Sequence, residues 1–381
     1  MPFEHFIQAN GKRLRCGYTT GTCAALAAAG AARYLLGGVW PETVSLRTPK
    51  GWTVEVPLEA CSSQGGTAQC AVRKDGGDDL DQTHGALICA AVTLTAAPGV
   101  IIEGGKGVGR VTAPGLDQPV GEAAINRVPR IMITQAVEEA LAAWDYAGGA
   151  LVVISVPEGE TIARQTFNPR LGIRGGISIL GTSGIVEPMS TQAVMDTIAL
   201  EIRQTAARGE QRLILTPGNY GLDYLARQGL DRLDASVVKC SNYLGHALDE
   251  AVLEGISELL LVGHIGKLVK LAGGIFQTHS RTADCRAELF CAHAALCGAD
   301  RALCAALMES PTSEASLALL ERAGLRQAVT DSLLKAIQTR LTGRVGERCV
   351  VGAVLFSTDF GFLGQTGEAE NLILKWRGSE W

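Results

Sequence analysis

The sequence has few aromatic residues, 5% of 381, against 47% hydrophobic residues and 46 glycines. A hydrophobic fraction of this size excludes an intrinsically disordered chain. An Ala- and Gly-rich composition of this kind is typical of α/β enzymes. The length favours two domains, each with a core of its own.

Basic runs and long hydrophobic runs are also missing. Lys and Arg number 34 against 39 Asp and Glu, a net charge of −5, and no basic stripe is available to neutralise phosphates. The N-terminus is polar and lacks the apolar segment of a signal peptide, and the longest apolar stretches are too short to span a membrane. We therefore expect a cytoplasmic protein that binds neither nucleic acid nor membranes.

No two of the eleven cysteines have the CxxC spacing that is typical of zinc sites and dithiol redox centres. One alternative is a metal site made by His293, Cys297 and Cys304, which share one face of a predicted helix. Buried cysteines more commonly behave as small hydrophobic residues. We therefore expect reduced thiols and no protein-bound metal.

Residues 1–150 mix helical and strand-like patterns. Alternation and Gly-rich turns predict two hairpins, and Ala-rich or periodic segments predict two helices; the hairpins cover residues 43–59 and 99–112, the helices residues 22–38 and 133–144. Thr20 and Thr22 are candidate caps of the first helix, and Gly37 and Gly38 are its stop. The order of these elements indicates an α+β domain.

Residues 151–381 alternate short apolar runs with helical patterns. Such alternation predicts right-handed βαβ units and a mainly parallel, Rossmann-like sheet. A helical C-terminal part follows, and residues 349–356 predict one further strand. The expected sheet strands before that part are residues 177–180, 212–216, 236–240 and 258–262.

Small and polar residues follow each of these four strands, at the edge where α/β proteins bind ligands. They are candidates for cofactor binding, and the alternative is that they only form tight turns. A nicotinamide site is disfavoured, because the glycine pattern is GxxG and the acidic Glu201 lies inside a predicted helix. The candidates are Gly181, Thr182, Ser183, Gly184, Gly218, Asn219, Ser241, Asn242 and Gly263.

Two further segments carry polar side chains near the N-terminus. Thr19, Thr20 and Thr22 stand at the start of the first helix, where free N–H groups and hydroxyls suit a carboxylate; an ordinary N-cap is the alternative. Residues 74–84 contain four Asp within seven positions, but their spacing does not fit a calcium loop. We expect this acidic loop to be solvated.

Nine stretches of the chain form a distinctive set, which runs in this order: GYTTGTCAA, KDGGDDLDQTHG, GGKGVGRVTAPGL, VGEAAINRVPR, SVPEGE, FNPRLGIRGGISILGTSGIVEPMS, TPGNYG, KCSNYLGHALDEA and VGHIGKLVKLAGGIFQTHSRTAD. Together they resemble the CbiD-type cobalt-precorrin-5B C(1)-methyltransferases of the anaerobic cobalamin pathway, and they follow the family's order. Departures from the family pattern are small: they fall at Leu80, Lys106 and Cys285, and Lys106 reverses a charge in a Gly-rich loop.

The resemblance implies that S-adenosylmethionine donates a methyl group to ring carbon 1 of a cobalt corrinoid, giving cobalt-precorrin-6A. His264 and His279 are then candidates for accepting the released proton. A corrinoid carrier without catalysis and a nicotinamide-dependent reductase are the alternatives. Carboxylates on the macrocycle need polar or cationic partners, for which the candidates are Tyr18, Thr19, Thr20, Thr22, Arg174 and Lys267.

Overall fold

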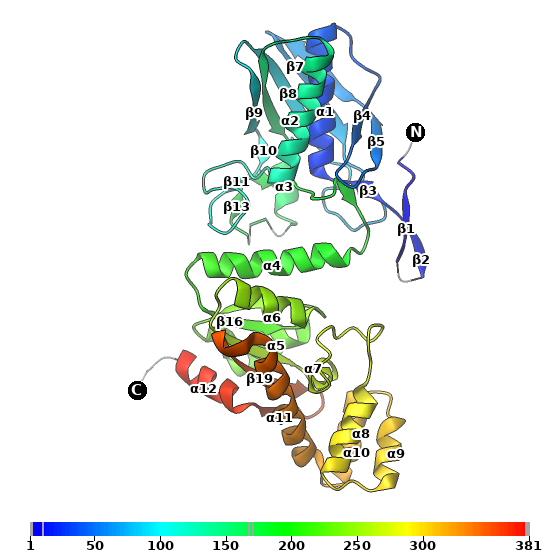
Figure 1. Cartoon of the computed structure of the whole chain (residues 1–381), viewed down its shortest axis with the longest axis vertical. Coiled ribbons are helices and arrows are strands. Elements are labelled where there is room, and N and C mark those ends of the chain that lie inside the picture. The colour runs from blue at the N-terminus through cyan, green and yellow to red at the C-terminus, as the bar shows by residue number, and fades with distance from the viewer. Residues whose placement is uncertain (1–2, 10, 167, 170, 378–381) are drawn as a thin grey trace. The chain divides into compact units, whose positions relative to one another are not determined.

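The computed structural model describes residues 3–9, 11–166, 168–169 and 171–377. The chain divides into two compact units, Met1–Thr191 and Gln192–Trp381 (Figure 1). The division lies later than the boundary that we expected near residue 150. The reason is that strand β12 (Gly149–Ser155) is an inner strand of the sheet of the first unit.

The first unit is built on a five-stranded mixed sheet. Its neighbouring strands are antiparallel, except that β12 pairs in parallel with β9. The strand order is β6 (Glu59–Gln64), β7 (Thr67–Arg73), β8 (Leu87–Thr95), β12, β9 (Gly99–Gly104).

Two long helices, α1 (Thr20–Gly37) and α2 (Arg127–Ala143), pack together and against this sheet (Figure 1). The many alanines of α1 bring its backbone close to the strands, and at Gly30 a Cβ would lie 2.6 Å from Leu58 Cδ1. The helix ends where Gly38 adopts φ 74° and donates its N–H to Tyr34 O. Both helices confirm the sequence prediction, although α2 begins six residues earlier than expected.

Short strand pairs complete the first unit. The predicted hairpin of residues 43–59 is confirmed, but residues 99–112 do not form the second, because their strands pair with distant segments. A five-residue helix, α3 (Gly159–Ala163), follows β12. The pairs are β1 (Phe6–Ala9) with β2 (Lys12–Arg15), β4 (Thr43–Arg47) with β5 (Thr53–Pro57), β3 (Gly17–Tyr18) with β15 (Ile185–Val186), β10 (Gly107–Val108) with β14 (Gly176–Ile177), and β11 (Arg110–Val111) with β13 (Ile173–Arg174).

The second unit also contains a five-stranded mixed sheet. Three of its four pairings are parallel, and the last strand, β20, is antiparallel to β19. The sequence predicted the first four strands of this sheet and missed β20. The order is β17 (Ser236–Lys239), β16 (Arg212–Thr216), β18 (Glu258–His264), β19 (Val350–Ser357), β20 (Gly361–Gln365).

Helices cover both faces of this sheet. Successive residues of a strand point to opposite sides, and here the side chains on both sides are apolar and need to be covered. In β16, Leu213 and Leu215 join one hydrophobic core, whereas Ile214 joins another. The larger core includes residues from α4 (Thr191–Ala207), α6 (Leu244–Leu253), α7 (Ile265–Ala272), α8 (Arg286–Leu296), α9 (Arg301–Met308), α10 (Ser313–Arg322) and α11 (Arg326–Val345). The smaller core includes residues from α5 (Asn219–Gln228), the 3-10 turn Leu230–Arg232 and α12 (Gly367–Trp376).

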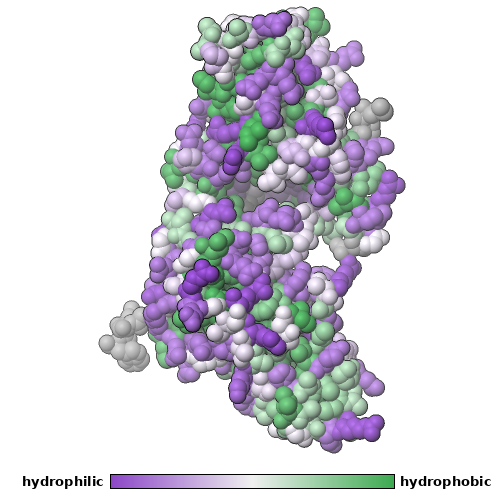
Figure 2. All heavy atoms as spheres, in the orientation of Figure 1, coloured by the Kyte–Doolittle hydropathy of each residue, from purple (hydrophilic) through white to green (hydrophobic). Residues whose placement is uncertain are grey.

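Hydrophilic residues prevail on the face of the molecule shown in Figure 2. A paler green area lies over α8–α10, the segment to which the exposed Leu296 and Met308 belong. Among the helices that the structure describes, none combines the length and the apolar character that crossing a membrane requires.

Gly352 in β19 provides a test of the packing between the sheet and α12. A Cβ at this position would lie 2.3 Å from Ala369 N, a backbone atom, whereas a Cβ on Gly343 in α11 meets nothing within 4 Å. Gly352→Ala should therefore lower the free energy of unfolding by about 1–3 kcal/mol. Gly343→Ala should raise it by up to about 1 kcal/mol, because Ala favours the helix. Urea unfolding measures both, and equal effects would contradict the packing.

Candidate functional site

In the second unit, four parallel strands end at one edge of the sheet, and four predicted cofactor residues follow two of these strands. Gly218 and Asn219 come after β16, and Ser241 and Asn242 after β17. Ser241 has a φ of 53°, unusual for a residue with a side chain, which marks a tight turn at this edge. The structure therefore brings these four residues to the edge where the sequence placed them.

The remaining cofactor candidates lie elsewhere. Gly263 is inside β18, where a Cβ would lie 2.9 Å from Leu268 Cγ, so it makes room for α7. Gly181–Gly184 belong to the first unit, because residues 177–180 are not a strand of the second sheet. Our expectation that four turns share one sheet edge is therefore wrong for the first of them.

A pocket of about 310 Å³ opens beside the strand ends of the second unit. It brings together four residues that the sequence singled out, Asn242, His264, Lys267 and His279. The other lining residues are Gly266, Lys270, Thr278, Ser280, Arg286, Thr312, Ser313 and Glu314.

His264 ends β18 and caps α7. Its Nδ1 accepts the N–H of Gly266 at 3.1 Å, so its Nε2 carries the hydrogen of the neutral ring and faces Glu314 Oε1 at 2.9 Å. Glu314 Oε1 also accepts the N–H of Thr358, and its Oε2 accepts the hydroxyl of Ser357. The His264 ring is therefore held by its neighbours through both nitrogens.

His279 lies on the loop after α7 and is exposed. The ring Nδ1 accepts the backbone N–H of Arg281 at 3.1 Å, and the backbone N–H of His279 donates to Gln277 Oε1 at 3.0 Å. The ring is held by a single local hydrogen bond, so it is freer to rotate than that of His264.

Lys267 and Lys270 extend from one face of α7 toward the pocket. Lys267 Nζ donates to Pro217 O, and Lys270 Nζ donates to Thr278 O and Ala283 O. Burial lowers the pKa of both lysines. A bound anion would favour their charged forms, so the pocket suits a negatively charged group.

In the first unit the threonine cluster and the Gly181–Gly184 turn, which we placed in different domains, contact each other. Thr22 Oγ1 donates to Gly184 O at 2.6 Å, and Thr20 Oγ1 accepts the N–H of Leu180 at 2.9 Å. Thr19 caps α1 by accepting the N–H of Thr22. All three threonines are buried. Their hydroxyls hold the turn against the start of α1.

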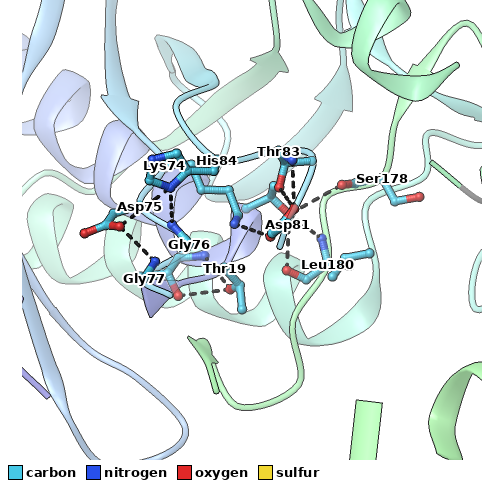
Figure 3. Close-up of polar contacts among 12 residues, drawn as sticks. Thr19, Lys74, Asp75, Gly76, Gly77, Asp81, Thr83, His84, Ser178 and Leu180 are labelled. Atoms are coloured by element: carbon cyan, nitrogen blue, oxygen red, sulfur yellow. Dashed lines mark hydrogen bonds and ion pairs between the residues drawn. The ribbon is translucent and has the colours of Figure 1, made fainter. Parts of the chain in front are cut away.

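The acidic loop packs against the same helix start (Figure 3). Asp75 O accepts the N–H of Tyr18, and a Cβ on Gly17 would lie 2.2 Å from that oxygen. Arg15 binds the Asp75 carboxylate through two nitrogens, at 2.5 and 2.9 Å. Our expectation of a solvated loop is therefore met only in part: residues 78, 80, 82 and 84 are exposed, whereas Asp75 is engaged with Arg15.

Lys74 is the buried centre of this loop, with 2% of its side chain exposed, and its Nζ lies 2.5 Å from Asp81 Oδ2. Thr83 donates its N–H and its hydroxyl to the other oxygen of Asp81 (Figure 3). Burial would raise the pKa of Asp81, but the charge and hydrogen bond of Lys74 outweigh it and lower the pKa. The carboxylate therefore stays ionised beside the lysine.

Two further substrate candidates lie in the first unit. Tyr18 is buried and donates its hydroxyl to Arg73 O, and burial raises its pKa. Arg174 in β13 is exposed.

No metal site is evident: no group of three or more His, Cys, Asp or Glu within the described ranges could hold an ion. His293, one member of the alternative metal site, bonds Ser332 Oγ at 2.8 Å.

Seven polar or charged residues of the pocket were not among the sequence candidates, and four of them matter most for its charge and geometry: Lys270, Arg286, Ser313 and Glu314. A signal existed for Lys270, which stands three residues after Lys267 and so lies on the same helix face. The sequence around Ser313 and Glu314 indicates only that a helix begins there, and it gives no sign that this helix start lines a pocket. Nothing in the chain order places that helix beside His264, some 50 residues away.

This arrangement defines the chain as a two-unit protein of helices and mixed sheets, with a charged pocket at the carboxyl edge of parallel strands in the second unit, a usual place for a small ligand. Family models for CbiD and for the CbiD C-terminal domain match residues 7–188 and 277–367. The chain belongs to the CbiD family. Phe167 and Arg170, within one of its characteristic stretches, lie outside the described residues.

Curated relatives are similar to this chain over nearly its whole length. The cobalt-precorrin-5B C(1)-methyltransferase of Ruminiclostridium cellulolyticum is 49% identical over 93% of this chain and 92% of its own. The protein of the same name from Alkaliphilus metalliredigens is 42% identical over 97% of both chains. A crystal structure of the cobalamin biosynthesis protein cbiD from Archaeoglobus fulgidus is 31% identical, covering 73% of this chain and 86% of that one, with a TM-score of 0.39.

Breaking the Lys74–Asp81 pair should destabilise the first unit strongly. Asp81→Asn leaves a buried ammonium without its counter-charge, which costs about 3–5 kcal/mol. The double variant Lys74→Met/Asp81→Asn should recover part of this loss. The exposed Asp145→Asn serves as the control. Urea unfolding, with hydrogen exchange in β7 and β8, measures these effects.

The loss of stability caused by Asp81→Asn should depend on pH. The folded pKa of Asp81 is lowered, so the advantage of the wild type over Asp81→Asn is complete above the unfolded pKa of about 3.9. It is lost as the pH falls through the folded pKa. A difference that persists unchanged in strong acid would contradict this role of the pair.

Proposed function

We propose that this chain is an S-adenosylmethionine-dependent C-methyltransferase that methylates ring carbon 1 of cobalt-precorrin-5B to give cobalt-precorrin-6A. The observation that carries the proposal is the near full-length similarity to relatives bearing that name, at 42–49% identity. The cobalt arrives with the corrinoid as part of the substrate. The protein needs no resident metal for this reaction.

In the reaction, ring carbon 1 attacks the methyl carbon of the sulfonium, a C–C bond forms and the S–CH₃ bond breaks. S-Adenosylhomocysteine leaves with the sulfur's electron pair, and a proton is released. Such an in-line displacement needs no protein nucleophile. Alignment of the two substrates in a site that excludes water can supply several kcal/mol of the barrier reduction.

The donor is proposed to bind at the carboxyl edge of the second sheet, whose parallel strands would act as a Rossmann-like platform. Gly218, Asn219, Ser241 and Asn242 stand at that edge, which supports the placement. Gly181–Gly184 are better assigned to holding the start of α1, because Gly184 O accepts the Thr22 hydroxyl and the Thr19 N–H.

The corrinoid carries several carboxylates, which call for cationic or hydroxyl partners. Lys267 and the exposed Arg174 remain our candidates for such contacts. Tyr18, Thr19, Thr20 and Thr22 are less suited to direct contact, because they are buried and their hydroxyls are engaged. We propose that this group acts indirectly, by fixing the start of α1 and the Gly181–Gly184 turn within the first unit.

For the released proton, His279 is the better placed of the two candidate acceptors. It is exposed at the pocket, and release of the single Arg281 N–H frees its Nδ1 lone pair. His264 would have to give up its cap of α7 to accept a proton at Nδ1, while its Nε2–H faces Glu314. We propose that His264 positions the start of α7.

The reaction itself can be followed with S-adenosylmethionine labelled in the methyl group and with cobalt-precorrin-5B as acceptor. The proposal predicts that the label appears in the corrinoid and that S-adenosylhomocysteine forms in equal amount. Corrinoid binding without transfer would indicate a carrier instead. Oxidation of NADH or NADPH coupled to corrinoid reduction would indicate a reductase.

His279→Ala should lower turnover by roughly 10²–10⁴-fold, the usual contribution of a general base. His246→Ala is the matched control, because His246 Nε2 bonds Met195 O and the residue does not line the pocket. Initial rates at saturating substrate make the comparison. Turnover equal to that of the wild type would remove His279 as the proton acceptor.

A further inference from the structure

Two helices begin at the pocket of the second unit. The first turn of α7 contributes Gly266 to its lining, and the first turn of α10 contributes Ser313 and Glu314. A helix start carries N–H groups without partners in the helix and a partial positive charge. Two such starts facing one pocket make it favourable for an anion.

An unpaired hydroxyl also points to a ligand. Ser313 is 3% exposed, and its Oγ has no hydrogen-bond partner among the described residues. The facing Gly266 has no side chain, and a Cβ there would lie 3.6 Å from this oxygen. Buried hydroxyls are normally paired, because leaving one unpaired is costly. A ligand oxygen in the pocket would supply the missing partner.

The charges of the lining favour a negative ligand. Lys267, Lys270 and Arg286 are cationic, and Glu314 is the carboxylate among the lining residues. The oxygens of Glu314 already accept hydrogen bonds from His264, Ser357 and Thr358.

Of the three cations, Lys267 is the least engaged. Arg286 binds Asp284 through two nitrogens, and Lys270 donates to two carbonyls. Lys267 has three donors, of which the described residues account for one, the bond to Pro217 O. Its ammonium is therefore the best placed to bind a ligand.

We infer that the pocket between the first turns of α7 and α10 binds a carboxylate group, with the Ser313 hydroxyl and the Lys267 ammonium as its partners. The inference rests on the proposed function for the source of that group. The source is either the methionine carboxylate of the methyl donor or an acetate or propionate arm of the corrinoid. The sulfonium centre of the donor is a cation and lies outside this pocket.

Ser313→Ala tests the site without disturbing the free protein, because it removes a hydroxyl that has no partner. Affinity for S-adenosylhomocysteine should fall roughly ten- to a hundredfold, the usual effect of one charge-assisted hydrogen bond. Affinity for methylthioadenosine, which has the same adenosine but no carboxylate, should not change. Isothermal titration with both ligands measures this outcome, which identifies the donor as the source.

If the corrinoid is the source, Ser313→Ala leaves both nucleoside affinities unchanged and raises KM for the corrinoid by a similar factor. Ser316→Ala, one turn along α10, is the matched control. Ser316 is also buried, but its Oγ is paired with Ser310 Oγ and Thr312 O. Its loss should lower the melting temperature and leave every affinity unchanged. Ser313→Ala without effect on either substrate would overturn the inference.

Selenate, an anion that takes no part in methyl transfer, tests the anion site independently of the proposed reaction. Crystals of the full chain soaked in selenate should show an anomalous selenium peak beside Ser313 and Lys267. The peak should be weaker in Ser313→Ala. A bound selenate in a protein that fails to transfer methyl groups would support the anion site and reject the methyltransferase. No peak at this position in the wild type would overturn the site.

Discussion

Glu314 is the side chain on which the geometry of the candidate site depends. Its carboxylate joins α10 to the end of β18 through His264 and to the end of β19 through Ser357 and Thr358. These contacts hold the start of α10 over the strand ends and place the neighbouring Ser313 at the pocket. The hydrogen bonds of the Glu314 carboxylate therefore fix the position of the unpaired Ser313 hydroxyl.

The first unit uses its polar residues differently. Lys74 and Asp81 form a buried ion pair, and Asp75 ties the acidic loop to Arg15. Gly17 allows the backbones of this loop and of β3 to touch. Residues that looked like ligands in the sequence are here engaged with one another. They stabilise the unit's fold and are not free binding groups.

The sequence predicted most of the second sheet, because the apolar runs 212–216, 236–240 and 258–262 are bounded by helices of ordinary length. It failed at residues 177–180, an apolar run of the same appearance. There, β14 (Gly176–Ile177) pairs with the distant β10. A short apolar run carries no information about its partner, so the glycine turn after it was placed in the wrong unit.

The same limit applies to the candidate site. Asn242, His264 and Lys267 were found, because they follow predicted strands or stand at the start of the following helix. His279 was found as an imidazole that could accept the proton in the reaction that the family resemblance implies. Ser313 and Glu314 were missed, since only tertiary packing brings α10 to β18. Whether a threonine caps a helix or binds a carboxylate was also undecidable from sequence, because both roles favour the same residues at the same position.

We propose that the methyl donor binds at the carboxyl edge of the second sheet. Hydrogen–deuterium exchange of the full chain, with and without S-adenosylhomocysteine, locates the binding site of the donor. Binding at this edge should slow exchange in residues 216–221, 239–245 and 263–280. Slower exchange confined to residues 17–25 and 181–187 of the first unit would contradict it.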